Sequence, residues 1–190
     1  MTSLQLFWLI LGLSWGTTEI VIALKTRVAF INTSKIEFRS ERLIWLIVLF
    51  ALFAALWVKR SHLIPFPIDP IARQIIAAVL FMTGLAIRSY AVLSLGTFFS
   101  TTVRTKDSHI LIESGPYRLI RHPAYTGLLF SFFGAGIAMG DGLAFLMLIV
   151  PIAYVLTQRI QLEEQWLLEH FGKNYADYSL RTKKLLPWIY

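Results

Sequence analysis

The feature of this 190-residue chain that most constrains its fold is a succession of apolar stretches. A membrane-spanning helix needs about 20 mostly apolar residues, because the bilayer interior offers no water to the backbone. Five stretches approach this length, at about residues 4–24, 43–58, 71–95, 123–139 and 143–156. We therefore expect an all-α fold with five transmembrane helices, forming one domain over residues 1–190.

The composition agrees with a membrane protein and excludes several other classes. Hydrophobic residues make up 56% of the chain and charged residues only 15%, whereas about a quarter of an average soluble domain is charged. The chain has no cysteine, which excludes disulfides, thiolate metal sites and cysteine nucleophiles. The four histidines lack the spacing of a metal site, so we expect no metal. In so apolar a chain the net charge of +7 predicts basic residues beside membrane spans and no nucleic-acid partner.

The basic residues also predict how the chain is oriented. Fourteen of the 18 Lys and Arg residues lie in segments 25–42, 96–122 and 157–190. Because basic segments stay on the cytosolic side, we expect these three segments to face the cytosol. The membrane would be the plasma or inner membrane of a bacterium, or the endoplasmic reticulum of a eukaryote. Gly140-Asp141-Gly142 is so short a turn that the fourth and fifth spans are expected to form a tight helical hairpin.

The first candidate site segment ends in Arg121-His122-Pro123, at the expected start of the fourth span. Proline suits the first turn of a helix, since it has no N–H to leave unpaired. His122 would then lie at the helix cap, where free backbone N–H groups favour an anion such as a carboxylate. Taken alone, this pattern indicates no more than a well-formed helix start at the membrane interface.

The second candidate segment continues the fifth span beyond the bilayer, as an amphipathic helix over residues 157–171 that ends at Gly172. Arg159 and Glu163 are four residues apart and share one face of this helix. Glu164 lies about 100° further round and can point elsewhere. Taken alone, these residues indicate a solvated helix face with one ion pair.

Together the two segments resemble the isoprenylcysteine carboxyl methyltransferase family, which is related to the phospholipid methyltransferases. The matching residues in the two segments are Arg121, His122, Pro123, Tyr125, Gly127, Arg159, Glu163, Glu164, Phe171, Gly172, Tyr175, Tyr178 and Pro187. Upstream, Asp107 to Tyr117 is similar to the family pattern D-G-H-x-L-V-x-x-G-P-Y, with Ser108 in place of glycine. The resemblance covers about the last half of the chain.

The resemblance implies an S-adenosylmethionine pocket at the cytosolic ends of the fourth and fifth spans. Glu163 or Glu164 would bind the cofactor ammonium, and the helix start with His122 and Pro123 would bind its carboxylate. The remaining candidate contacts are Tyr117 or Tyr125 at the sulfonium, and His109, Ile110 and Leu111 beside the adenosine.

The candidate catalytic residues are Arg121, His122, Arg159 and Glu163. Either arginine would neutralise and orient an anionic methyl acceptor, and His122 or a glutamate would be the base for an amine acceptor. The resemblance implies a lipid-like or prenylated acceptor that reaches the site from the surrounding membrane lipids. Carboxyl O-methylation of an isoprenylated cysteine is the favoured reaction.

Other functions stay open on the sequence alone. Phospholipid amine N-methylation and small-thiol S-methylation are alternatives within methyl transfer. A membrane reductase that uses NADPH is less favoured, because the chain lacks the larger helix count of such enzymes. A transporter or membrane scaffold would leave the two polar segments unexplained.

Two ionisable residues fall inside predicted spans. Glu19 would either face the interior of the helix bundle or reach water near the end of its span. Arg88 is expected to extend its guanidinium toward the cytosolic interface, with lining of the substrate cavity as the alternative.

Overall fold

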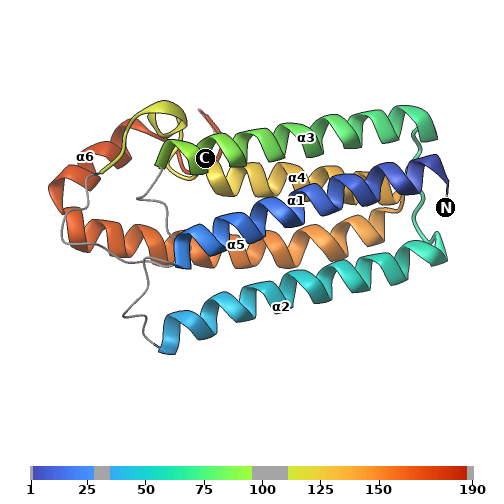
Figure 1. Ribbon diagram of the computed structural model, residues 1–190, viewed down its shortest axis with the longest axis horizontal. Coiled ribbons are helices and arrows are strands. Elements are labelled where there is room, and N and C mark those ends of the chain that lie inside the picture. The colour runs from blue at the N-terminus through green and yellow to red at the C-terminus, as the bar shows by residue number, and fades with distance from the viewer. Residues whose placement is uncertain (1, 28–34, 96–110, 188–190) are drawn as a thin grey trace.

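The computed structural model describes residues 2–27, 35–95 and 111–187, and its helices are shown in Figure 1. Within these ranges the fold is all-helical, with β-pairing limited to two isolated bridges. The α-helices are α1 (Ser3–Arg27), α2 (Lys35–Val58), α3 (Pro70–Leu95), α4 (Pro123–Met139), α5 (Gly142–Phe171) and α6 (Lys173–Arg181). Two short 3-10 turns are η1 (Lys59–Ser61) and η3 (Gly115–Arg118).

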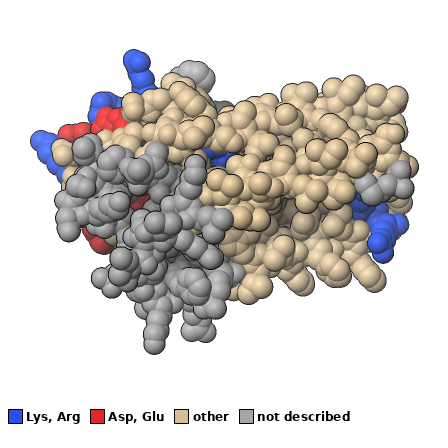
Figure 2. Space-filling view, viewed as in Figure 1, with Lys and Arg blue, Asp and Glu red and all other residues tan. Residues whose placement is uncertain are grey.

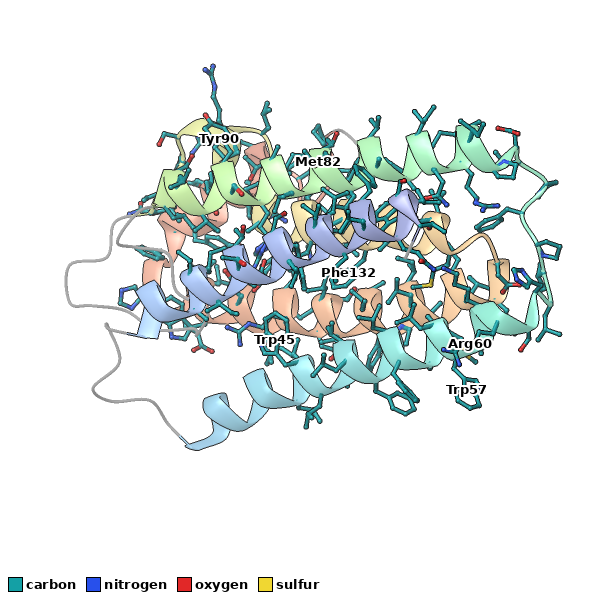
Figure 3. The ribbon with its side chains drawn as sticks, turned by 45° about the vertical axis from the view of Figure 1, so that its right-hand side comes forward. Trp45, Trp57, Arg60, Met82, Tyr90 and Phe132 are labelled. Atoms are coloured by element: carbon teal, nitrogen blue, oxygen red, sulfur yellow. The ribbon has the colours of Figure 1, made fainter. Side chains whose placement is uncertain are left out.

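The five long helices run along the long axis of the molecule, as Figure 1 shows. The short helix α6 and the turn η3 gather at one end, whereas the N-terminus lies at the other. Helix α4 packs against both α3 and α5, and α2 packs against α5. Figure 3 shows Phe132 of α4 inside the bundle, whereas Trp57 of α2 points outward.

Four of the helices, α1, α2, α3 and α5, are long and apolar enough to cross a membrane. Their outer faces present many exposed leucine, isoleucine and phenylalanine side chains, a surface that suits lipid better than water. Figure 2 shows charged residues near the two ends of the molecule, with a broad region of other residues between them. The chain is therefore an integral membrane protein.

Helix α4 is the predicted span that differs from the other four. It has only 17 residues, which corresponds to about 25 Å at 1.5 Å per residue, and the hydrocarbon core is about 30 Å thick. Phe133 is its one exposed residue, because the other positions pack against neighbouring helices. Helix α4 is therefore apolar in sequence, but little of its surface is exposed.

Several predicted boundaries are confirmed, among them the start of the second candidate membrane span at Leu43. Helix α4 begins at Pro123 with His122 at its cap, and α5 continues to Phe171 before Gly172, whose φ of 52° ends the helix. Helix α2, however, begins at Lys35 rather than near residue 43. The apolar stretch marks only the part of a helix that suits lipid, and the charged residues before it extend the same helix.

The turn between α4 and α5 contains only Gly140 and Asp141, and Asp141 holds it in place. Its carboxylate accepts hydrogen bonds from the backbone N–H of Ala144 at 2.9 Å and of Ile64 at 2.8 Å. These bonds keep the pKa of Asp141 below its ordinary value. One side chain thus caps α5 and attaches the segment after η1 to the same turn.

Glycines allow α3 and α4 to approach until their backbones touch. A Cβ atom at Gly127 would lie 2.6 Å from the backbone nitrogen of Arg88 and 2.6 Å from the carbonyl oxygen of Gly84. A Cβ atom at Gly134 would meet the carbonyl oxygen of Ala77 at the same distance. Small residues at membrane helix contacts allow this close approach. The glycine of the R-H-P-x-Y-x-G pattern is therefore a packing residue.

Glu19 and Arg88 form a buried ion pair between α1 and α3. Each residue is only 6% exposed. The guanidinium donates to both carboxylate oxygens, from Nε to Oε1 and from Nη2 to Oε2 at 2.7 Å. It also donates from Nη1 to the carbonyl oxygen of Ala124, in the first turn of α4, at 3.2 Å. The expectation that Arg88 extends to the cytosolic interface is wrong, because two nitrogen atoms of its guanidinium bind the buried carboxylate of Glu19.

The glycine contact gives a first prediction. Gly127→Ala should lower stability by about 1–3 kcal/mol, because the added methyl group meets the backbone of Gly84 and the backbone and Cβ of Arg88. Thermal unfolding in detergent measures the change. Gly12→Ala on α1 is the matched control, since no atom lies within 4 Å of its added Cβ and alanine favours a helix. Equal melting temperatures for the two variants would contradict the close contact.

The ion pair gives a second prediction. Glu19→Gln or Arg88→Met should each cost about 3–5 kcal/mol, because each leaves one buried charge without its partner. The double variant should cost less than the two single costs added together, since no unpaired charge remains. A double-mutant cycle measured by thermal unfolding tests this, and strictly additive costs would show that the pair is not coupled.

Candidate active site

The candidate site lies at the end of the bundle where α4 begins and α5 ends. A segment after α6 pairs with the residues just before α4, through a parallel bridge between Ile120 and Lys183. The backbone N–H of Arg121 donates to the carbonyl of Lys183 at 2.7 Å, and that of His122 to the carbonyl of Lys184 at 3.0 Å. These two N–H groups are therefore occupied by backbone carbonyls.

The carboxylate of Glu164 on α5 is the centre of the site. Its Oε1 accepts from Arg121 Nε at 2.8 Å and lies 3.3 Å from His122 Nε2. Its Oε2 lies 2.9 Å from the Lys184 ammonium. One carboxylate therefore joins the end of α5, the start of α4 and the segment after α6.

Arg121 extends the same network along α6. Its Nη1 donates to the carbonyl oxygen of Ser179 at 2.8 Å and also to that of Thr182. Thr126, one turn into α4, donates through its hydroxyl to the carbonyl oxygen of Leu185 at 2.7 Å. Side chains at the start of α4 thus satisfy backbone groups at the end of α6 and beyond it.

Glu163 faces a different neighbour from Glu164. It accepts a hydrogen bond from the hydroxyl of Tyr125 at 2.8 Å, and the positive charge of Arg159 also acts on this hydroxyl. Arg159 and Glu163 therefore share one helix face, as their spacing predicts. A carboxylate has about four acceptor positions. Glu163 uses one of them within the described residues, so it retains capacity for a cationic ligand.

Two further tyrosines, Tyr117 and Tyr178, lie near these charges. The hydroxyl of Tyr178 donates to the backbone carbonyl of Tyr117 at 2.7 Å, which joins α6 to η3. Burial raises the pKa of Tyr178 to about 12. Burial, with the negative charge of Glu163, raises the pKa of Tyr117 well above its ordinary value. Both phenols therefore stay protonated at neutral pH and are hydrogen-bond donors rather than bases.

The structure brings most of the predicted site residues together at this end of the bundle. The assembled residues are Tyr117, Arg121, His122, Pro123, Tyr125, Arg159, Glu163 and Glu164. Leu111 is half-buried ahead of η3. His109 and Ile110 lie outside the described residues. In the part of the chain that the structure describes, no group of three or more His, Asp or Glu residues is placed to hold a metal.

Sequence reasoning missed the contribution of residues 179–185. Most of their contacts with α4 are made by backbone carbonyls, which carry no sequence signal. Lys184 is the exception, because it makes its contact through its side chain. The sequence shows this basic residue ahead of the final proline, but it indicates no partner for it. Its contact with Glu164 depends on the turn after α6, which brings the chain back to α4.

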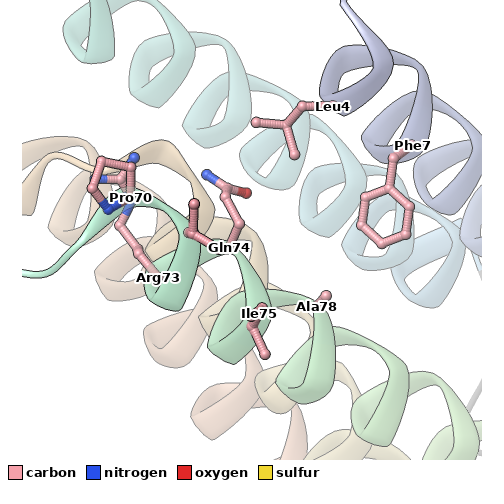
Figure 4. A pocket seen from close by; sticks show the side chains of 8 residues that line it. Leu4, Phe7, Pro70, Arg73, Gln74, Ile75 and Ala78 are labelled. Atoms are coloured by element: carbon pink, nitrogen blue, oxygen red, sulfur yellow. The ribbon is translucent and has the colours of Figure 1, made fainter.

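A hollow lies between α1 and α3 at the opposite end of the molecule. Figure 4 shows Leu4 and Phe7 of α1 facing Pro70, Gln74 and other residues of α3. The amide of Gln74 is already occupied, by Trp8 at 2.7 Å and by the carbonyl of Ala138 at 3.1 Å. The hollow is apolar and open, and it offers no paired acid and base, so the candidate active site is at the other end.

The fold and the site together define an integral membrane helix bundle with a polar, charge-paired site at one end. The family described as phospholipid methyltransferase matches residues 72–174, more than half of the chain. The chain belongs to this family.

Individual relatives agree with the resemblance to isoprenylcysteine carboxyl methyltransferases. A probable protein-S-isoprenylcysteine O-methyltransferase of Oryza sativa subsp. indica is 32% identical over 116 residues, which are 60% of this chain and 61% of that protein. The Xenopus laevis protein-S-isoprenylcysteine O-methyltransferase is 30% identical over 61% of this chain and 41% of its own length. The chain thus spans less than two thirds of each of these relatives.

A solved structure supports the fold. It is that of the eukaryotic intramembrane Ras methyltransferase ICMT, isoprenylcysteine carboxyl methyltransferase. The match has a TM-score of 0.59 and 24% identity, and it covers 86% of this chain and 56% of that one. The shared helix arrangement therefore extends beyond the last half of the chain, where the motifs lie, into the N-terminal helices.

The two adjacent glutamates give a third prediction. Glu164→Gln should lower the melting temperature of the ligand-free protein, because Arg121 and Lys184 would lose their shared counter-charge. Glu163→Gln should lower it less, since an amide oxygen still accepts from Tyr125. Thermal unfolding without ligand compares the two. A larger loss for Glu163→Gln would contradict the central role assigned to Glu164.

Proposed function

We propose that this chain is an S-adenosylmethionine-dependent methyltransferase whose favoured acceptor is the carboxylate of an isoprenylated cysteine or a similar lipid-like acid. The observation that supports this most directly is that the two adjacent glutamates have different binding partners. Glu164 is held by Arg121, His122 and Lys184, whereas Glu163 is bound by Tyr125 alone among the described residues. Family membership and the names of the relatives favour methyl transfer.

The residues present fit the charges of S-adenosylmethionine. Glu163 would bind the ammonium through its unused acceptor positions. The start of α4, with His122 and Pro123, would bind the cofactor carboxylate. The ring of Tyr125, whose centroid is 5.7 Å from that of His122, would face the sulfonium.

The other residues of the predicted pocket are Tyr117, Pro123, His109, Ile110 and Leu111. Tyr117 is held in the fold by α6, so Tyr125 is the better placed of the two predicted sulfonium neighbours. Pro123 sets the start of α4. His109, Ile110 and Leu111 keep their proposed place beside the adenosine.

The chain's own residues would orient the acceptor rather than activate it. When bound, S-adenosylmethionine supplies an electrophilic methyl group on its sulfonium sulfur. A carboxylate acceptor is already a nucleophile at neutral pH, so it needs alignment and exclusion of water. Arg159 is only 7% exposed, and its guanidinium would neutralise and position that carboxylate. Arg121 shares this role only if its bond to Glu164 is released.

We propose further that all five long helices cross the membrane and that the site faces the cytosol. Helix α4 would complete the set of five despite its 17 residues, because α3 and α5 cover its sides. The odd number of spans places the N-terminus outside and both polar segments inside, in agreement with the distribution of basic residues. A prenyl chain would then approach from the bilayer and the cofactor from the cytosol.

Phospholipid amine N-methylation is a second candidate, because the matching family is described as phospholipid methyltransferase. An ethanolamine headgroup would first have to lose a proton. His122 or Glu163 would be the base for this reaction, but His122 already lies beside the Glu164 carboxylate.

The decisive experiment supplies radiolabelled S-adenosylmethionine to the purified protein in lipid. A prenylated cysteine with a free carboxylate should gain label as a base-labile ester, and the same compound with an amidated carboxylate should gain none. An ethanolamine phospholipid should stay unlabelled. Glu163→Gln should weaken cofactor binding by about tenfold or more, through loss of a charge-assisted bond. Base-stable label in the phospholipid would instead favour N-methylation.

A further inference from the structure

The hollow between α1 and α3 is lined almost entirely by apolar side chains that face outward. Leu4 and Phe7 form its α1 side, and Ile71 and Ile75 lie on its α3 side. All four are exposed, and on each helix they are three or four residues apart, so they form one continuous stripe. The hollow has a volume of about 390 Å³, which is in the range of ligand pockets. Its lining therefore suits an apolar ligand that enters from the bilayer.

The position of the hollow along the helices matches the edge of the bilayer. The candidate spans of α1 and α3 begin at this end, at Ser3 and Pro70. Next to the hollow, the indole N–H of Trp8 donates to the side-chain oxygen of Gln74 at 2.7 Å and joins the two helices. The hollow thus lies within the first turns of both spans, at the depth where acyl chains meet lipid headgroups.

Arg73 lines the same hollow, and its guanidinium has no hydrogen-bond or ion-pair partner within the described residues. Its Nε is buried without a partner. One face of the guanidinium lies against Gly140, since a Cβ there would be 2.7 Å from Cζ and 2.9 Å from each Nη atom. The N–H groups lie in the guanidinium plane, so this contact leaves those at its edge free to bind a ligand.

The carboxylates described at this end of the molecule are engaged elsewhere. Asp69 accepts hydrogen bonds from two backbone N–H groups in the first turn of α3, both at 2.9 Å. Asp141 accepts from two backbone N–H groups at the turn before α5. Neither forms an ion pair with Arg73 in the ranges that the structure describes. The counter-charge of Arg73 is therefore left to a ligand, because an unpaired guanidinium that is partly removed from water is costly.

We propose that the hollow binds a glycerophospholipid, with one acyl chain between α1 and α3 and the phosphate at Arg73. The apolar stripe is complementary to the chain, and the planar guanidinium is complementary to phosphate oxygens, which it often binds in pairs. In the orientation proposed above, the lipid belongs to the non-cytosolic leaflet. The site is at the opposite end of the bundle from the candidate active site, so this inference does not depend on the proposed function.

Two lipids with the same chains and different headgroups test the contact with Arg73. Native mass spectrometry of the full chain in detergent measures binding of dioleoyl phosphatidylglycerol and of dioleoylglycerol, which has no phosphate. The wild type should bind the phospholipid more tightly. Arg73→Gln should weaken phospholipid binding roughly tenfold to a hundredfold, as expected for hydrogen bonds to a charged group. Binding of dioleoylglycerol by this variant should be unchanged.

Two further variants serve as controls. Arg60→Gln removes an exposed charge from η1 at the same end (Figure 3), outside the lining of the hollow, and should bind both lipids as the wild type does. Ala78→Leu places a larger side chain in the hollow and should weaken the binding of both lipids. Ala78 is half-buried rather than in the core, and thermal unfolding without lipid checks that this variant folds.

The remaining outcomes would overturn the proposal. Equal losses for Arg73→Gln and Arg60→Gln would show only a general attraction between phospholipid and the basic residues of this end. Equal binding of the two lipids by the wild type would show that Arg73 does not bind the phosphate. Unchanged binding by a folded Ala78→Leu variant would show that the acyl chain lies elsewhere. Methyl transfer is not a readout here, so each of these results leaves the proposed function as it stands.

Discussion

The direct contact between the backbones of α3 and α4 is the constraint on which the rest of the molecule depends. Gly84 and Gly127 leave no room for a side chain between the two helices. This contact fixes the depth at which α4 begins, and so the positions of His122 and Tyr125. The same closeness lets Arg88 on α3 reach the carbonyl of Ala124, so that the buried pair with Glu19 attaches α1 to this contact.

The site is then assembled by charge on a framework set by packing. Glu164 gathers two cationic side chains and an imidazole from segments that are distant in sequence. Desolvation of such a group is costly, and several charge-assisted bonds offset that cost. Glu163, one residue earlier, accepts a hydrogen bond from Tyr125 instead. Adjacent carboxylates on one helix thus perform two tasks, because successive residues are rotated by about 100°.

The sequence was most informative where a local rule determines the structure. Pro123 predicted the start of α4, and Gly172 predicted the end of α5, because proline and glycine restrict or release the backbone itself. Hydropathy located the apolar part of every long helix. It could not show that α2 begins at Lys35, since a charged extension is helical without being apolar.

The site was predictable from a family pattern and only partly from chemistry. The pattern named both glutamates, whereas spacing alone showed that Glu163 and Glu164 face different directions. The pair between Glu19 and Arg88 was not predicted, because the two residues are 69 positions apart and only the tertiary fold joins them. The carbonyl groups of residues 182–185 were equally hidden, since every residue type has one.

The pairing of Lys183 and Lys184 with Arg121 and His122 has a consequence for the biosynthesis of the protein. The ribosome synthesises α4 and α5 before the segment that follows α6. Until that segment emerges, Glu164 lacks Lys184 and the start of α4 lacks its paired strand. The site is therefore complete only once this last-made segment has paired with the start of α4.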